Sequence, residues 1–342
     1  MAASALHCGV ICAKMNQQGR RMNGWPAERG TPMGKFDGVL LVSDFDDTYV
    51  GLDGCVPARN LQALDYFRGE GGRFTIATGR SHRTFTPQLG RMPLDAPVVL
   101  SNGSALYDYR EDRMLVQTYL PDSAPEDFAW LLNELPQLAL ETYHGDDIYV
   151  CRPNAYSQAH LVKVGCGCTV CPPEEIPTPW TKAIFHQERQ VLLQARRLLL
   201  DRVGTERYEA IFSNAVYLEM TARGSTKGGM VAHMLQYTGG PAEHLYCVGD
   251  NQNDIPMLER SAIPFAPANC AREVRDWGAR VLCSCDEGVI GDIVDILDGI
   301  YREVVRGRTH NPSLPHMMRV LEQAAPRPAG RPLAVRTRED HR

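Results

Sequence analysis

The 342-residue chain lacks the marks of a membrane protein, of a strongly charged protein and of a disulfide scaffold. No apolar run approaches the roughly 18 residues that a membrane span requires. The 36 Lys and Arg residues nearly balance the 41 Asp and Glu residues, so the formal charge of −5 gives no signal for binding nucleic acid or an anionic membrane. The 11 cysteines are scattered, which fits a reducing, cytoplasmic compartment better than a disulfide framework.

Apolar residues make up 44% of the chain, so a sizeable core can form and wholesale disorder is not expected. The length allows two domains. The two ends differ in composition from the rest. We expect residues 1–35 to form a flexible N-terminal extension, and residues 306–342, with eight arginines and several prolines, to form a flexible basic tail.

Short apolar runs alternate with segments of helical periodicity at two places in the sequence. The first place has strands at 39–43, 74–78 and 97–100, with a helix from Pro57 to Phe67. The second has a helix that opens at Thr226, a strand over 245–248 and further strands near 262–265 and 280–283. This alternation of strands and helices predicts an α/β fold with a parallel sheet and right-handed crossovers.

Between these two blocks the pattern mixes alternating, strand-like segments with helical ones. It predicts an α+β insertion over residues 107–216. The expected domains are therefore a core from residues 36–106 and 217–305, and an inserted cap over 107–216. Cys168 and Cys171 in this insertion have the spacing of a zinc knuckle, but no second pair follows nearby, so a structural metal is not expected from the cysteines.

Three carboxylates follow the first apolar run, at Asp44, Asp46 and Asp47. An acidic loop at the carboxyl end of a buried parallel strand lies where open α/β sheets bind their ligands. Asp44 and Asp46 share one face if the extended geometry persists, and together they can hold a hard cation such as Mg2+. Alone, however, acidic residues after a strand are often turn formers and helix caps.

Three further sites follow a strand or open a helix in the same way. Thr78 and Gly79 can present a hydroxyl and a backbone N–H to an anion, although such pairs are often ordinary caps. Lys227 lies near a helix N-terminus, where a lone lysine is usually a solvated charge. Asp250 and Asp254, with amides between them, offer more oxygen ligands for the metal of the first site.

The four sites together, read as DFDDT, ATGR, STKGG and GDNQND, resemble the motifs of the haloacid dehalogenase (HAD) superfamily of phosphohydrolases. The insertion between the second and third motifs, and SNGS at 101–104 just before it, are similar to the Cof-type (subfamily IIB) branch. The resemblance covers residues 36–305. It implies a Rossmannoid parallel-sheet core with an inserted α+β cap of the C2B type.

The resemblance also implies a mechanism that the chemistry of these residues supports. Asp44 would attack phosphorus and form an aspartyl-phosphate, and Asp46 would first donate and then accept a proton. Mg2+ would be held by Asp44, the backbone carbonyl of Asp46 and Asp250, with Asp254 as a ligand or as support for one. The transferring phosphoryl group would contact side chains and backbone at Thr78, Gly79, Lys227 and Asn253. Alternatively, Asn253 orients Lys227.

Asp47 departs from the family pattern, because members usually have glycine at this position. If the backbone there needs a positive φ, Asp tolerates it better than most residues but less well than glycine. We expect activity to survive.

The cap is expected to cover the leaving group, and its candidate substrate contacts are Tyr143, His144, Tyr149, Arg152, His160 and Lys182. The resemblance favours small phosphorylated metabolites as substrates, with sugar phosphates first and phosphorylated cofactors such as flavin mononucleotide or pyridoxal phosphate second. The alternatives are a phosphomutase and a non-catalytic phosphometabolite-binding protein. A monomer without nucleic-acid or membrane partners is expected.

Overall fold

A computed structural model describes residues 34–240 and 242–307. The predicted N-terminal extension and basic tail lie outside the described residues, apart from a few positions at their inner ends. Within the described ranges no helix is long and apolar enough to cross a bilayer. The first compact unit of the chain ends at Ile293 and a second begins at Val294.

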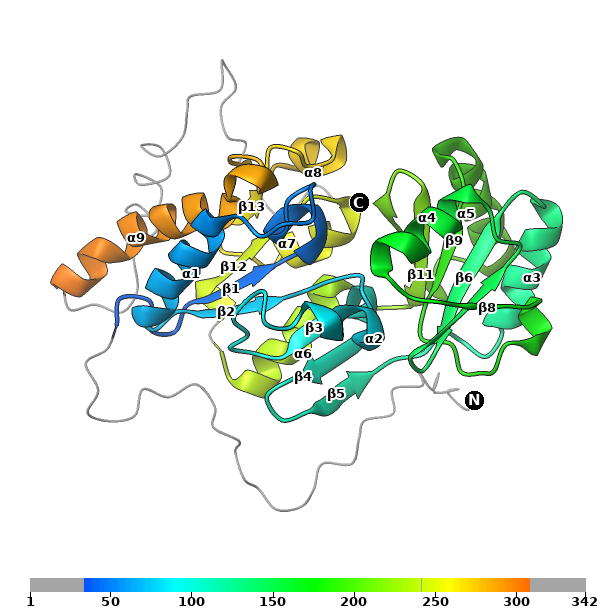
Figure 1. The fold of residues 1–342 in the computed structure, drawn as a ribbon, viewed down its shortest axis with the longest axis horizontal. Coiled ribbons are helices and arrows are strands. Elements are labelled where there is room, and N and C mark those ends of the chain that lie inside the picture. The colour runs from blue at the N-terminus through cyan, green and yellow to red at the C-terminus, as the bar shows by residue number, and fades with distance from the viewer. Residues whose placement is uncertain (1–33, 241, 308–342) are drawn as a thin grey trace, which may run out of the picture. The chain divides into compact units, whose positions relative to one another are not determined.

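The central sheet is parallel throughout, in the order β14-β13-β12-β1-β2. Figure 1 shows β1 between β12 and β2. Its strands are β1 (Leu40–Ser43), β2 (Arg73–Ile76), β12 (Leu245–Val248), β13 (Pro264–Ala266) and β14 (Arg280–Val281). All four residues of β1 are buried, as the continuous apolar run of a central parallel strand predicts.

The helices that accompany this sheet are α1 (Ala58–Gly69), α2 (His82–Phe85), α6 (Lys227–Thr238), α7 (Ile255–Leu258) and α8 (Arg272–Trp277). Helix α9 (Val289–Gly307) begins in the first unit and continues into the second. Helix α6 begins where the sequence predicts, because the Thr226 hydroxyl accepts a hydrogen bond from the backbone N–H of Gly229 at 2.9 Å. A Cβ at Gly228 would lie 1.9 Å from the Pro256 carbonyl oxygen, so only glycine permits this approach of α6 to α7.

The predicted third strand of the parallel sheet has different partners in the structure. Strand β3 (Val98–Leu100) pairs antiparallel with β4 (Ala105–Asp108), and β4 pairs with β5 (Arg113–Gln117). A single parallel bridge, between Ala77 and Val99, links β3 to the segment after β2. The turn between β3 and β4 explains the difference, because Asn102 and Gly103 at φ 54° and 96° reverse the chain into a hairpin.

A six-stranded sheet, in the order β10-β11-β9-β6-β7-β8, covers most of the predicted insertion and continues past residue 216. Its strands are β6 (Ala139–His144), β7 (Asp147–Cys151), β8 (Thr169–Val170), β9 (Ala183–His186), β10 (Tyr208–Asn214) and β11 (Tyr217–Ala222). The accompanying helices are α3 (Ala124–Glu134), α4 (Ala155–Val164) and α5 (Arg189–Val203). A separate apolar core, rich in aromatic contacts around Phe128, holds this layer together. The exact limits of the cap, 107 and 216, stay a prediction.

Candidate active site

One pocket collects the motif residues at the carboxyl ends of the parallel strands. Asp44 directly follows β1, Thr78 lies two residues after β2, and Asp250 lies two residues after β12. All three line the same pocket, together with Asp46, Gly79 and Asn253. Residues separated by some 200 positions in sequence therefore meet at one sheet edge, as the topology of a parallel sheet requires.

Lys227 lies buried behind this pocket, between two carboxylates. Its Nζ atom donates to Asp44 Oδ1 at 2.5 Å and to Asp254 Oδ1 at 2.6 Å. The Lys227 side chain is 1% exposed, so this cation is not the solvated charge that a lone lysine usually is. Burial lowers the pKa of Lys227 but the charges of Asp254 and Asp44 outweigh burial and raise it above its usual range. Lys227 is therefore a fixed positive charge next to Asp44.

Asp254 organises the loop after β12. Its second oxygen, Oδ2, accepts hydrogen bonds from the backbone N–H groups of Asp250 and Asn251, both at 3.0 Å. A Cβ at Gly249 would lie 2.4 Å from the Cβ of Asp254, which explains the glycine before Asp250. Both oxygens of Asp254 thus have partners, and these contacts hold Lys227 and the acidic loop in place.

Asp44 and Asp250 form the part of the site where negative charge is least compensated. Burial raises the pKa of Asp44 to about 7, although Lys227 opposes the shift. Burial also raises the pKa of Asp250 well above its usual range, and the charges of Asp44 and Asp254 add to this effect. The Thr48 hydroxyl donates a hydrogen bond to Asp250 Oδ1 at 3.0 Å. A further cation bound beside these two carboxylates would favour their ionised forms.

The residues present fit the divalent cation that the motifs imply. Among the described residues, oxygens of Asp44, Asp250 and Asp254 all lie within 4.8 Å of one another. Carboxylate oxygens are the ligands that Mg2+ prefers. Because Lys227 and two backbone N–H groups already use the oxygens of Asp254, Asp44 and Asp250 are the side chains with donor capacity left for a metal.

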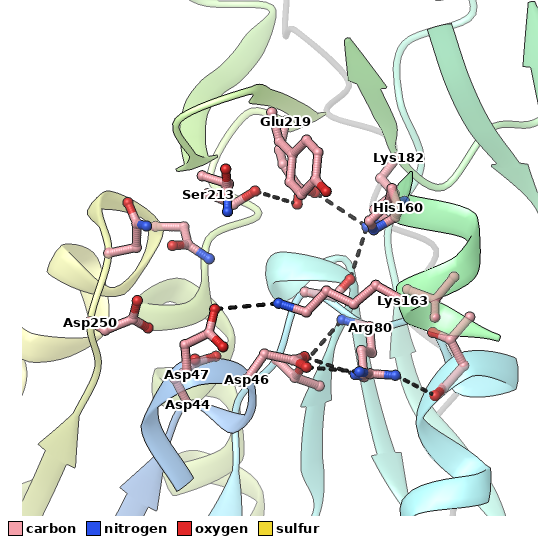
Figure 2. A pocket seen from close by; sticks show the side chains of 18 of the residues that line it. Asp44, Asp46, Asp47, Arg80, His160, Lys163, Lys182, Ser213, Glu219 and Asp250 are labelled. Carbon is pink, nitrogen blue, oxygen red and sulfur yellow. Dashed lines mark hydrogen bonds and ion pairs between the residues drawn. The ribbon is translucent and has the colours of Figure 1, made fainter. Parts of the chain in front are cut away.

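The Asp46 side chain is held by an arginine that the sequence did not single out. Arg80 donates through Nε to Oδ2 at 2.8 Å and through a terminal nitrogen to Oδ1 at 2.7 Å, a bidentate pair (Figure 2). Burial raises the pKa of Asp46, but the hydrogen bonds and charge of Arg80 outweigh burial and lower it. Asp46 is thus ionised and oriented in this structure.

Asp47 adopts the left-handed conformation that glycine favours, with φ 61°. Its backbone carbonyl accepts a hydrogen bond from Asn269 at 2.8 Å, and its carboxylate pairs with Lys163 of α4 at 3.3 Å (Figure 2). The side chains of this pair are 44% and 33% exposed, so the pair contributes little to stability. The aspartate therefore occupies a glycine-like backbone position and adds a contact to the inserted region.

Thr78, Gly79 and Asn253 complete the core side of the pocket. The Thr78 hydroxyl accepts a hydrogen bond from the Arg80 N–H at 3.1 Å, which leaves its own proton available to a ligand. Asn253 donates to Asn102 Oδ1 at 2.9 Å, and no hydrogen bond joins it to Lys227 in the described structure. The alternative role of Asn253 as a direct partner of Lys227 is thus not seen, and its amide oxygen stays without a partner.

The inserted region supplies the opposite wall of the pocket. Of the predicted cap contacts, Tyr143, His160 and Lys182 line it, whereas His144, Tyr149 and Arg152 do not. Lys182 donates to the Gly79 carbonyl at 2.8 Å and pairs with Glu219 at 3.2 Å (Figure 2). Sequence reasoning missed nine lining residues. Two of them lie inside the motifs, Arg80 and Asn251, and seven lie outside the motifs and carry no local signal: Thr84, Lys163, Val164, Ser213, Asn214, Tyr217 and Glu219.

Residues 41–293 match the family model for haloacid dehalogenase-like hydrolases. The chain is 24% identical over 256 residues to the pyridoxal phosphate phosphatase YbhA of Escherichia coli K12, covering 69% of this chain and 90% of that relative. It is 25% identical over 241 residues to the HMP-PP phosphatase of Klebsiella pneumoniae, covering 69% of this chain and 86% of that relative.

Solved structures show the same fold. A subclass IIB sugar phosphatase of the HAD superfamily superposes with a TM-score of 0.65 at 19% identity, covering 79% of this chain and 99% of the other. A HAD/COF-like hydrolase from Plasmodium vivax gives a TM-score of 0.66 at 21% identity, covering 77% of this chain and 95% of the other. The α/β class expected from the sequence, a parallel-sheet core with a cap, is confirmed.

Proposed function

The chain belongs to the haloacid dehalogenase-like hydrolase family, as a Cof-type member, and we propose that it is a Mg2+-dependent phosphomonoester hydrolase. The observation that carries the proposal is the arrangement of buried Asp44 and Lys227 with partly buried Asp250 at the carboxyl edge of the sheet. It pairs a nucleophilic carboxylate with a fixed cation and with space for a divalent metal. Relatives named as phosphatases support the same reaction class.

Asp44 is the proposed nucleophile. Its Oδ1 atom is held by Lys227, so the other oxygen is free to approach phosphorus along the pocket. Attack of this oxygen forms the aspartyl-phosphate and breaks the bond to the leaving oxygen. Mg2+ held by Asp44, Asp250 and the Asp46 backbone carbonyl would neutralise charge that develops on the phosphoryl oxygens.

Asp46 is the proposed proton carrier, and its pairing with Arg80 sets a condition on that role. A carboxylate whose pKa is lowered holds no proton at neutral pH, so Asp46 must first release at least one Arg80 hydrogen bond and take up a proton from solvent before it can donate to the leaving oxygen. Once it has given up its proton, Asp46 accepts one from the water that attacks the aspartyl-phosphate. The Thr78 hydroxyl and the Gly79 backbone are the proposed donors to the phosphoryl group.

The proposed substrates are small phosphorylated metabolites, with sugar phosphates first. The polar side chains of the cap wall, including Lys182, Ser213 and Glu219, supply hydrogen-bonding groups of the kind that a polyhydroxylated leaving group requires. The nine described cysteines are all free, which supports the proposal of a cytoplasmic protein. We propose a monomer, since every motif residue of the pocket comes from one chain.

A Mg2+-supplemented screen of phosphorylated metabolites tests this function. We expect phosphate release from at least one small phosphomonoester by the wild-type protein, and none by Asp44→Asn, which keeps the shape of the side chain. Release that persists in Asp44→Asn would contradict the nucleophile assignment. Phosphate that appears on a second sugar hydroxyl rather than in solution would favour a phosphomutase, and a flat screen with proven ligand binding would favour a non-catalytic binding protein.

A further inference from the structure

A second cluster of titratable side chains lies in the cap, apart from the motif residues. Glu141 comes from β6, His160 from α4 and His186 from the end of β9. His160 Nδ1 lies 2.9 Å from Glu141 Oε2, and His186 Nε2 lies 3.2 Å from the same oxygen. Glu141 and His186 are fully buried, while the His160 side chain is 12% exposed. The three elements therefore converge on one point in the interior of the cap.

His186 is the unsatisfied member of this cluster. Although its Nε2 atom lies close to Glu141, the geometry is not that of a hydrogen bond, and neither ring nitrogen has a hydrogen-bond partner among the described residues. A fully buried imidazole whose nitrogens make no well-aligned hydrogen bond is costly, and such groups normally find a partner. The other oxygen of Glu141, Oε1, already accepts from the Tyr143 hydroxyl at 2.5 Å. Both imidazoles thus converge on one atom, Glu141 Oε2.

We propose that Glu141, His160 and His186 bind a transition-metal ion of the zinc class, as a second metal site distinct from the acidic site in the core. One ligand atom from each of the three residues lies within 4.8 Å of the others. Metal–ligand bonds of about 2.0–2.2 Å in a tetrahedral site place neighbouring ligand atoms roughly 3.3–3.6 Å apart. The distances from Glu141 Oε2 to His160 Nδ1 and to His186 Nε2, 2.9 and 3.2 Å, need to widen by only a few tenths of an ångström to match this geometry.

The donor types separate this site from the core site. Two imidazoles and one carboxylate suit zinc and its neighbours, whereas the all-carboxylate set around Asp44 suits Mg2+. Burial lowers the pKa of His186, which favours the neutral imidazole that binds a metal. The Tyr143 hydroxyl holds the carboxylate of Glu141 from behind, as partners of metal ligands commonly do.

The position of the cluster suggests what a bound metal does. His160 lines the active-site pocket, and the Tyr217 ring, another lining residue, lies 5.0 Å from each imidazole ring. With three protein ligands, a tetrahedral ion keeps one position for water or for an oxygen of a ligand. A metal here would fix α4 to the cap sheet and would place a Lewis-acidic centre beside the wall of the pocket that His160 and Tyr217 line.

Cobalt binding to the full-length, chelator-treated protein tests the proposal without any need for activity. With Mg2+ present in saturating amounts, we expect one Co2+ per chain with the visible absorption of an imidazole-ligated, four-coordinate ion, and displacement of that ion by Zn2+. His186→Ala and His160→Ala should each weaken binding at least tenfold. His233→Ala, which removes an exposed histidine of α6, and Asp250→Asn, which alters the core site, should leave the spectrum unchanged.

Three results would overturn the proposal. They are absence of stoichiometric Co2+ binding by the wild-type protein, persistence of the spectrum in both histidine variants, and a thiolate-to-cobalt charge-transfer band, which would place the metal on cysteines. Because His186→Ala removes a buried side chain and can unfold the cap, imidazole 15N resonances of the wild-type protein give a second readout. Zn2+ should shift the nitrogen signals of two histidines, and unchanged signals would leave the cluster a hydrogen-bonded network.

Discussion

Lys227→Met tests whether the buried lysine holds the acidic site together. Methionine keeps much of the length of the side chain but removes the charge between Asp44 and Asp254, which Lys227 contacts at 2.5 and 2.6 Å. Breaking a buried ion pair by removing one partner costs about 3–5 kcal/mol, because the remaining charge is left uncompensated. For a domain of this size that cost corresponds to a fall in Tm of roughly 6–20 °C.

The assay is thermal unfolding without divalent metal at pH 8 and at pH 5. The raised pKa values of Asp44 and Asp250 let these carboxylates take up protons as the pH falls. The fall in Tm caused by Lys227→Met should therefore be smaller at pH 5 than at pH 8. The matched control is Lys163→Met, which removes an exposed partner of Asp47 and should cost no more than about 1 kcal/mol. Equal, small Tm changes for both variants would refute the reasoning.

Three further predictions concern neighbouring groups. Burial raises the pKa of Asp44 from 3.8 to about 7, so the metal-free protein should lose stability as the pH rises through this window. Mg2+ should therefore raise Tm more at pH 8 than at pH 5, and equal increases in Tm at the two pH values would count against this. Arg80→Leu should raise the pKa that Asp46 contributes to the pH dependence of kcat/KM, and an unchanged profile would contradict the pairing. Asp47→Gly should change unfolding free energy by less than about 1 kcal/mol, because relief at φ 61° offsets the lost pair with Lys163, whereas Asp47→Ala should be less stable than Asp47→Gly.

The sequence predicted those parts of the fold that local patterns determine. The apolar run before Asp44 is a fully buried strand, and Thr226 caps the helix that carries Lys227. The apolar pattern of residues 97–100 predicts a strand of the parallel sheet, whereas β3 pairs antiparallel with β4, because three apolar residues say nothing about the direction of the neighbouring strand. Pairing of that strand is decided by the positive φ angles of the turn that follows it.

In the candidate site, too, the sequence predicted what local patterns determine and missed contacts that depend on the folded structure. The motifs bring Asp44, Thr78 and Asp250 to one pocket, since each follows a strand of a parallel sheet. The partner of Asp46 was not predicted, because nothing in the spacing of Arg80 shows that its guanidinium turns toward a residue 34 positions earlier. Contacts of this kind depend on the packing of side chains across elements.

The cluster in the cap left no signal in the sequence for a different reason. Glu141, His160 and His186 lie 19 or more residues apart, on a strand, a helix and a second strand, so no local spacing identifies them as neighbours. The sequence suggested a metal site at Cys168 and Cys171 because these two cysteines are close in sequence. The structure instead brings two histidines and a glutamate together, and it leaves these cysteines free.

The central claim is that Asp44 becomes phosphorylated during turnover. Acid-quenched protein, mixed with Mg2+ and a substrate found in the metabolite screen, can be digested and its peptides analysed by mass spectrometry. Our account predicts a phosphorylated aspartate at Asp44 in wild-type protein, more abundant early in turnover, and none in Asp44→Asn. Substrate hydrolysis that proceeds with no modification at Asp44, or with phosphate on another residue, would contradict it.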